Sequence, residues 1–315
     1  QCWWLLVLLG PSVLGALLKG TSHCHIGGPQ NPPYTCHEPD VLNATWYYTW
    51  DSVPPLCDLA EQKAEWYPQI NALDEAETIF HNVSKLGPWK LRAVLGPNEP
   101  NAGTTAPKIT VADAVDGWRR WFEPIAAQRG VQYLVSPSTA HCACSGPRCA
   151  GGGGANTPTG YCDENWIHEF MRNCTGCRID AIGVHWYPFF RDYNETIDPC
   201  LGSNKTLCVE HLRSHLLTLT IYGKPLWITE FCAATIGRMP DASAPKVELP
   251  FLEAALEAID TVPLVHRVAP FSARQGRRDF AGCSMLEMHP SFGPGLTETG
   301  SYYAAWQPKH EHPEQ

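Results

Sequence analysis

Two glutamates lie where apolar runs of the sequence end, and their type and position suit acid–base chemistry. Glu99 lies near the end of "LRAVLGPNEP" (residues 91–100), and Glu230 follows the apolar run of "KPLWITEFC" (residues 224–232). Each run is typical of a buried strand. Taken singly, such an acid is often only a surface charge or a cap. Two carboxylates on either side of a scissile bond are, however, the groups that glycoside hydrolysis requires.

In that chemistry one acid stays protonated to donate to the leaving oxygen. The other stays ionised to attack the anomeric carbon or to activate water. We expect mutual repulsion and partial burial to raise the pKa of the proton-donating acid.

Amide, histidine and aromatic side chains accompany both acids. Asn98 could cap a turn or hydrogen-bond the 2-hydroxyl of a sugar. His185 ends another expected strand, where a lone histidine is more often structural. The aromatic residues of "TWYYTW" alternate along one strand and share a face, so they could stack on sugar rings or fill the core. The candidate substrate-binding residues are Asn98, Trp46, Tyr48, Trp50, His185 and Tyr187.

Other chemistries find less support. "GGGG" at residues 151–154 lacks the Lys-Ser/Thr of a phosphate-binding loop. The "HCAC" segment with Cys149 and Cys162 could supply zinc ligands, but disulfides are the favoured interpretation outside the cell. A G-x-S-x-G nucleophile elbow does not occur in the sequence.

Short apolar runs alternate with helix-compatible segments along the chain, which favours parallel strands with crossover helices. Expected strands cover residues 19–22, 45–50, 65–70, 90–98, 133–137, 180–186, 226–230 and 266–272. Expected helices cover residues 71–85, 111–130, 165–174, 208–223 and 249–260. Eight such strands predict an α/β fold, a (β/α)₈ TIM barrel, with Glu99 ending the fourth strand and Glu230 the seventh. Those strands face each other, so both acids can converge at the C-terminal end of the barrel.

The chain divides into three segments. Residues 1–18 are typical of a truncated signal peptide, although a buried first strand or helix is an alternative. Residues 19–306 form the expected barrel, and the polar tail at residues 307–315 is expected to fray. Cys- and Gly-rich insertions at residues 141–162 and 188–208 follow the fifth and sixth strands, at the active-site face of a barrel.

Composition limits the partners and the compartment. The formal net charge of −9 disfavours nucleic acid and anionic membranes, whereas a neutral sugar polymer is compatible with it. Fourteen cysteines and five N-x-[ST] sequons, at Asn43, Asn82, Asn173, Asn194 and Asn204, favour an oxidising compartment. We expect a secreted or cell-wall protein that is a monomer and, once mature, has no membrane segment. Loss of Cys2 with the leader would leave thirteen cysteines, so one would be free or paired elsewhere.

Several motifs occur in an order and spacing that resemble one family. They are "TWYYTW", "GPNEP", the C-x-x-C of Cys174 and Cys177 leading into "IDAIGVHWYP", and "GKPLWITEF". The chain resembles the alkali-sensitive-linkage-protein-like glycosyl hydrolases, glycoside hydrolase family 128, over roughly residues 19–306. The resemblance implies a barrel and a retaining endo-β-1,3-glucanase that binds β-glucan without a cofactor. It places the acid/base at Glu99 and the nucleophile at Glu230.

The sequence also departs from that family. Its eighth strand usually reads like tyrosine-alanine-tryptophan-phenylalanine, but residues 268–271 here are Val-Ala-Pro-Phe. We therefore expect an aromatic wall to be missing. The insertion at residues 142–162 is long and could shift internal attack toward attack at chain ends. Cys232 follows the T-E-F motif directly, and a disulfide to Cys283 is suspected.

Two other functions remain open from the sequence. The same barrel could bind β-glucan without cleaving it, as a cell-wall protein. The same two acids could also hydrolyse a different β-glucan linkage, because linkage choice depends on the shape of the groove.

Overall fold

The computed structural model describes ten segments of the chain. These are residues 13–22, 38–53, 63–86, 91–102, 108–140, 165–187, 205–232, 244–273, 283–287 and 295–314. The predicted insertion at residues 141–162 and most of the one at 188–208 lie outside these ranges, as do two of the five sequons.

All eight predicted barrel strands form, most of them shorter than expected. They are β2 (Leu18–Ser22), β3 (Trp46–Tyr48), β4 (Glu65–Tyr67), β5 (Ala93–Leu95), β6 (Tyr133–Val135), β7 (Ile182–Trp186), β8 (Leu226–Phe231) and β9 (Val265–Val268). Six of them form one parallel sheet in the order β4-β3-β2-β9-β8-β7, while β5 pairs with β6. This is the cyclic strand order of a (β/α)₈ barrel.

The wall of the barrel is not a continuous ladder. At the junction of β4 and β5 a bridge joins Gln69 to Leu95, and at that of β6 and β7 bridges join Val135 to Ala181 and Thr139 to Val184. Backbone hydrogen bonds support each junction, for example from the amide of Ser136 to the carbonyl of Ala181 at 2.9 Å. The α/β fold and the strand order are therefore as predicted, with two weakly joined seams.

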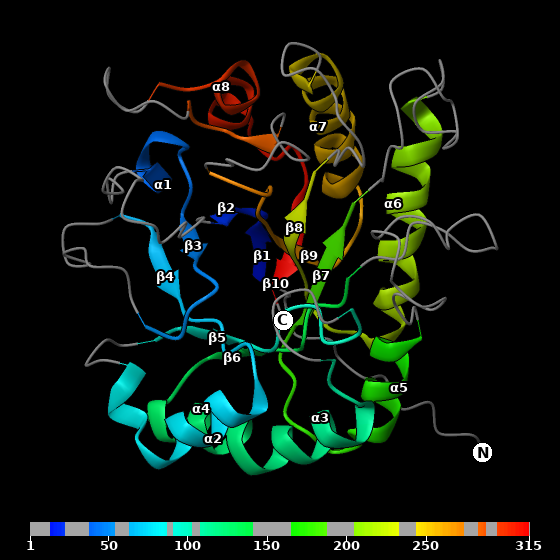
Figure 1. Cartoon of the computed structure of the whole chain (residues 1–315). Helices are drawn as coiled ribbons and strands as arrows, with labels where there is room; N and C mark the ends of the chain where they lie inside the picture. Colours follow the sequence, from blue (N-terminus) through cyan, green and yellow to red (C-terminus); the bar gives the residue numbers. More distant parts are fainter. Residues whose placement is uncertain are drawn as a thin grey trace, which may run out of the picture.

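Helices surround the strands (Figure 1). They are α1 (Glu38–Val41), α2 (Leu73–His81), η1 (Val83–Leu86), α3 (Val111–Gly117), η2 (Trp118–Phe122), α4 (Glu123–Arg129), α5 (Trp166–Asn173), α6 (Lys205–Leu219), η4 (Thr220–Tyr222), α7 (Ala244–Asp260) and α8 (Glu298–Ala305). The single helix predicted at residues 111–130 is interrupted by η2, which is one π-helical segment. The helix predicted at 249–260 begins earlier, so Pro250 lies inside α7.

Large side chains fill the interior of the barrel. Trp46, Tyr67 and Trp227 have ring centroids 5.7–5.8 Å apart. The guanidinium of Arg267 on β9 lies 4.4 Å from the ring centroid of Trp227, within cation–π distance. Gly20 is required at its position because a Cβ there would meet the Trp46 ring at 2.2 Å. The interior is therefore packed, and the chemistry must take place at the C-terminal end of the strands.

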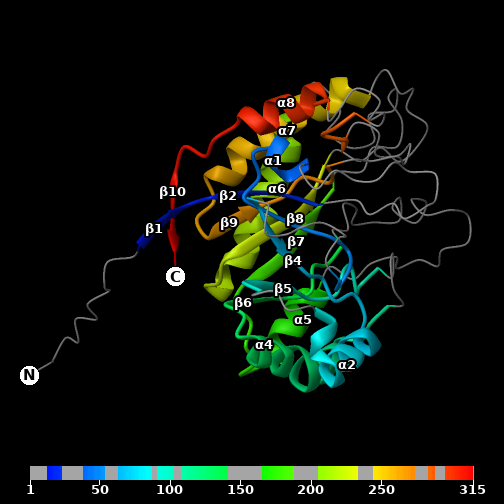
Figure 2. The ribbon, with the colours of Figure 1, turned by 90° about the vertical axis from the view of Figure 1, so that its left-hand side faces the viewer.

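The polar tail differs from expectation because it is ordered. Strand β10 (Glu311–Glu314) pairs antiparallel with β1 (Val13–Ala16), so part of the segment expected as a leader is also a strand (Figure 2). Asp260 at the end of α7 anchors the tail, accepting from the amide of Lys309 at 2.8 Å and lying 2.9 Å from Nδ1 of His310. In the described part of the chain, helices are too short or too polar to span a membrane.

Candidate active site

Glu99 occupies a turn beyond the end of β5. Asn98 forms a parallel bridge with Ser138, and the amide of Glu99 donates to the carbonyl of Ser138 at 2.8 Å. Glu99 has a φ of 45°, in the left-handed region that a non-glycine residue rarely adopts. Pro100 follows and disfavours a helical conformation at Glu99. Strained backbone of this kind is typical of functional sites, and here it holds the carboxylate at the mouth of the barrel.

Glu230 lies inside β8, and three ring side chains donate to its carboxylate. Oε1 accepts from the indole Nε1 of Trp50 at 2.8 Å. It also lies 3.2 Å from the hydroxyl of Tyr48, whose one proton it shares with the carbonyl of Thr229 at 3.0 Å. Oε2 accepts from the hydroxyl of Tyr187 at 2.5 Å. Because Glu230 is only 4% exposed, these donors replace the water that would otherwise solvate the charge.

His185 lies between the two acids. Its Nδ1 is 3.2 Å from Oε1 of Glu99 and 3.4 Å from Oε2 of Glu230. The ladder between β7 and β8 shifts register beside His185, which places this residue opposite Glu230. Carboxylate oxygens of Glu99 and Glu230 lie within 4.8 Å of each other. The two predicted acids therefore meet, with a buried imidazole against both.

Burial and mutual interaction shift the pKa values of this group. Burial raises the pKa of Glu230 and the charge of Glu99 adds to this, whereas His185 and the Tyr187 and Trp50 donors act in the opposite direction. Burial alone would lower the pKa of His185, but the carboxylates of Glu230 and Glu99 raise it above its usual 6.5. Burial and Glu230 also raise the pKa of Tyr187, so its hydroxyl remains a hydrogen-bond donor.

Most of the residues predicted to bind substrate contact the carboxylate of Glu99 or of Glu230. Tyr48, Trp50, His185 and Tyr187 all bond to or adjoin a carboxylate, as described above. Trp46 is fully buried, and its indole donates to the carbonyl of Leu18 at 3.2 Å. Its position is therefore in the barrel core, which agrees with the core alternative for the innermost aromatic residue of "TWYYTW".

Two amide residues at the site were missed by the sequence reasoning. Gln69, just beyond β4, places its Nε2 3.5 Å from Oδ1 of Asn98. Asn101 exchanges two hydrogen bonds with the backbone of Ala140, at 2.8 and 3.0 Å, and so ties the Glu99 turn to the segment after β6. Gln69 lies near the end of the strand expected at residues 65–70, and Asn101 follows the one expected at 90–98. A polar residue at the end of an expected strand was the signal that could have identified both.

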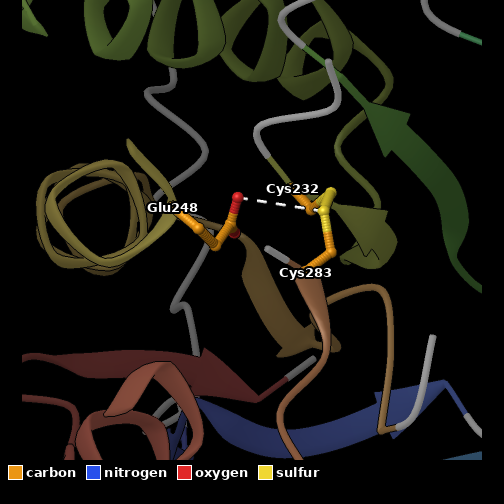
Figure 3. Close-up of side chains that lie close together, drawn as sticks. All are labelled: Cys232, Glu248 and Cys283. Carbon is orange, nitrogen blue, oxygen red and sulfur yellow. Dashed lines mark hydrogen bonds between the residues drawn. A yellow bond between two sulfur atoms is a disulfide. The ribbon is translucent and has the colours of Figure 1, made fainter. Parts of the chain in front are cut away.

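A second cluster brings together Cys232, directly after β8, Glu248 on α7, and Cys283 (Figure 3). The predicted disulfide between Cys232 and Cys283 is confirmed, and the buried Glu248 carboxylate lies 3.8 Å from Sγ of Cys283. Because both sulfurs are in the disulfide, they offer no thiolate to a metal. A further disulfide joins Cys174 and Cys177.

Glu99, His185 and Glu230 also have the spacing of a possible metal site. Both oxygens of Glu230 already accept hydrogen bonds from protein donors. Hydrogen bonds to an ionised carboxylate are strong, so these donors fix the orientation of Glu230.

The barrel and its paired carboxylates define the chain as a glycoside hydrolase. The family model described as the glycosyl hydrolase catalytic core matches residues 34–303, and the chain belongs to this family. The chain is 24% identical over 260 residues to alkali-sensitive linkage protein 1 of Schizosaccharomyces pombe, covering 82% of this chain but 39% of that protein. The predicted resemblance to this group is confirmed.

Solved structures show the same fold. A glycoside hydrolase family 128 (subgroup II) endo-β-1,3-glucanase from Sorangium cellulosum matches with a TM-score of 0.60 and 24% identity, over 91% of this chain and 98% of that one. A variant of a subgroup I endo-β-1,3-glucanase from Amycolatopsis mediterranei, in complex with laminaripentaose, matches with a TM-score of 0.61 and 22% identity, over 92% and 99%.

Proposed function

We propose that this chain is a retaining endo-β-1,3-glucanase that acts by double displacement. The observation that carries the proposal is the proximity of the Glu99 and Glu230 carboxylates, whose oxygens lie within 4.8 Å. Retaining glycosidases hold their two carboxyls about 5–5.5 Å apart, whereas inverting enzymes need about 6.5–9.5 Å to admit a water. Single oxygens this close support the shorter separation of the two carboxyls and, with it, a covalent intermediate.

In this mechanism Glu230 attacks the anomeric carbon and forms a glycosyl–enzyme ester. Glu99 gives its proton to the departing glycosidic oxygen, then takes a proton from the water that cleaves the ester. The environment supports this division of roles. Trp50 and Tyr187 donate to Glu230 and oppose the rise in its pKa that burial causes, so they favour the ionised form that a nucleophile needs. The raised pKa falls on Glu230, whereas we expected it on the proton-donating acid. A positive charge on His185 would stabilise the same ionised form.

The choice of β-1,3-glucan as substrate rests on relatives. Two structural neighbours are described as endo-β-1,3-glucanases, and one contains laminaripentaose. A neutral glucan also suits a chain with a formal charge of −9. Since the chain spans 39% of the length of its matched curated relative, the proposal concerns this segment, with residues 19–306 as the catalytic barrel.

We also propose that the protein is secreted. Asn43, Asn82 and Asn173, the three sequon residues in the described part of the chain, are all exposed and open to glycosylation. The two disulfides agree with an oxidising compartment.

Product analysis on laminarin tests the proposed activity. Short oligosaccharides, released first as the β-anomer in NMR spectra, would support an endo-acting and retaining enzyme. Release of the α-anomer would contradict the double displacement. Glucose as the sole early product would contradict internal attack, and cleavage of cellulose or mixed-linkage glucan alone would change the substrate. Binding of laminarin without any release would favour the non-catalytic alternative.

A further inference from the structure

Phe271 lies against both of the ring side chains that bond to different oxygens of Glu230. Its ring meets the ring of Trp50 edge-on at a centroid distance of 5.6 Å, and that of Tyr187 at 5.8 Å. Trp50 donates to Oε1 and Tyr187 to Oε2. Phe271 therefore supports the two donors that bond to Glu230 from its two sides, although it does not itself bond to the acid.

The Cys232–Cys283 disulfide fixes the backbone that carries Phe271. The amide of Phe271 donates to the carbonyl of Phe231 at 3.1 Å, one residue before Cys232. The amide of Ser272 donates to the carbonyl of Cys283 at 3.2 Å. Both cysteines are fully buried, and they pack in one cluster with Tyr187 and Phe271. The disulfide thus joins the end of β8, where Glu230 lies, to the segment that holds Phe271 in place.

We infer that Phe271, braced by the Cys232–Cys283 disulfide, is a positioning residue that keeps Trp50 and Tyr187 on the two oxygens of Glu230. The inference rests on the proposed function only in giving Glu230 the role of nucleophile.

Loss of this support has a direct chemical consequence. The described titratable groups that face Glu230 are Glu99, His185, Tyr48 and Tyr187. If Trp50 and Tyr187 move away, two hydrogen bonds that favour the ionised carboxylate weaken. The acidic limb of the pH–rate profile should then move to higher pH. The turnover number should fall more than KM rises, because ground-state binding of the glucan does not depend on these bonds.

The first test compares three variants at one position. Phe271→Ala should lower kcat at least tenfold and move the acidic limb of kcat/KM to higher pH. Phe271→Leu, which keeps bulk but not the ring, should lie between Phe271→Ala and the native protein. Phe271→Tyr, which keeps the ring, should restore most of the activity. Equal profiles for Phe271→Ala and the native protein would overturn the inference, as would a loss confined to KM.

The second test uses the two described disulfides as a matched pair. The double variant Cys232→Ser/Cys283→Ser should reproduce the loss of kcat and the shifted acidic limb of Phe271→Ala. The control Cys174→Ser/Cys177→Ser removes a disulfide at the end of α5 and should leave both unchanged. If the two double variants show the same kcat and the same acidic limb, the Cys232–Cys283 disulfide does not position the donors to Glu230, and the inference is overturned.

A third measurement does not require turnover. Carbon-13 NMR of labelled glutamate side chains, with the Glu230 signal assigned from Glu230→Gln, reports the ionisation of Glu230 directly. Its titration should move to higher pH in Phe271→Ala and in Cys232→Ser/Cys283→Ser, but not in Cys174→Ser/Cys177→Ser. An unmoved titration in the first two, in folded protein, would overturn the inference. A protein that shows the shift but cleaves no laminarin would contradict the proposed function alone.

Discussion

Glu99 and Glu230 belong to strands that lie apart in the barrel wall, yet their carboxylate oxygens come within 4.8 Å of each other. Glu99 reaches this position from a left-handed turn beyond β5, and Glu230 from within β8. The two carboxylates differ in their surroundings. Trp50 and Tyr187 donate to the two oxygens of Glu230, whereas Glu99 lies against Nδ1 of His185.

Replacement of the nucleophile should abolish turnover and preserve binding. Glu230→Gln keeps the size of the side chain but cannot form a glycosyl ester, so we expect kcat on laminarin to fall on the order of 10⁴-fold or more. Calorimetry should show laminari-oligosaccharide binding within a few-fold of the native protein. Glu253→Gln, on the exposed face of α7, is the matched control and should behave as native. Retained turnover in Glu230→Gln would exclude the proposed mechanism.

The loss of activity on replacing the acid should depend on the leaving group of the substrate. Glu99→Gln cannot protonate a sugar leaving group, so kcat on laminarin should fall by about 10²- to 10⁴-fold. Aryl β-glucosides with acidic phenols need little protonation, so their glycosylation step should be much less affected. A burst of released phenol would measure that step. If aryl substrates suffered as much as laminarin, Glu99 would not be the general acid.

The histidine between the acids should set the pH range of activity. Burial raises the pKa of Glu230 above 4.5, so activity should fall on the acidic side at a higher pH than for an exposed glutamate. His185 opposes this rise, because its positive charge stabilises the carboxylate. His185→Gln should therefore move the acidic limb of kcat/KM to still higher pH. The other titratable groups that face Glu230, namely Glu99, Tyr48 and Tyr187, remain in that variant. An unchanged acidic limb would show that the charge of His185 does not affect the ionisation of Glu230.

Two tryptophans of "TWYYTW" should give different results in mutagenesis. Trp50→Phe loses the Nε1 bond to Glu230, and a hydrogen bond to a charged group is worth about 1.5–3 kcal/mol, or roughly a 10- to 100-fold loss of kcat. Trp46→Phe leaves space in the barrel core and should lower the free energy of unfolding by about 1–3 kcal/mol with little change in kcat. Urea denaturation and laminarin kinetics on both variants would separate the roles. A raised KM in Trp46→Phe would instead place this residue in the glucan site.

Much of the fold and of the site could be predicted from the sequence because the relevant signals are local. Each barrel strand is a short apolar run between helix-compatible segments, and all eight were located. Glu99 and Glu230 were identified as acids at the ends of such runs, and the C-terminal ends of parallel strands must share one face. The Cys232–Cys283 pairing was suspected from the resemblance and is confirmed. The ordered tail was missed, because its anchor at Asp260 is distant in sequence.

The tertiary structure alone decided what each predicted residue does. Spacing in "TWYYTW" put three aromatic residues on one face, but only the tertiary structure shows that Trp46 bonds to the carbonyl of Leu18 whereas Tyr48 and Trp50 reach Glu230. Likewise, the contacts of His185 with both acids depend on a register shift between β7 and β8 that carries no local signal. Strand periodicity determines which side of a strand a residue occupies, whereas contacts across the barrel depend on long-range register and packing. The sequence by itself therefore determined the barrel and the pair of acids, and the packed structure decided their hydrogen-bond partners.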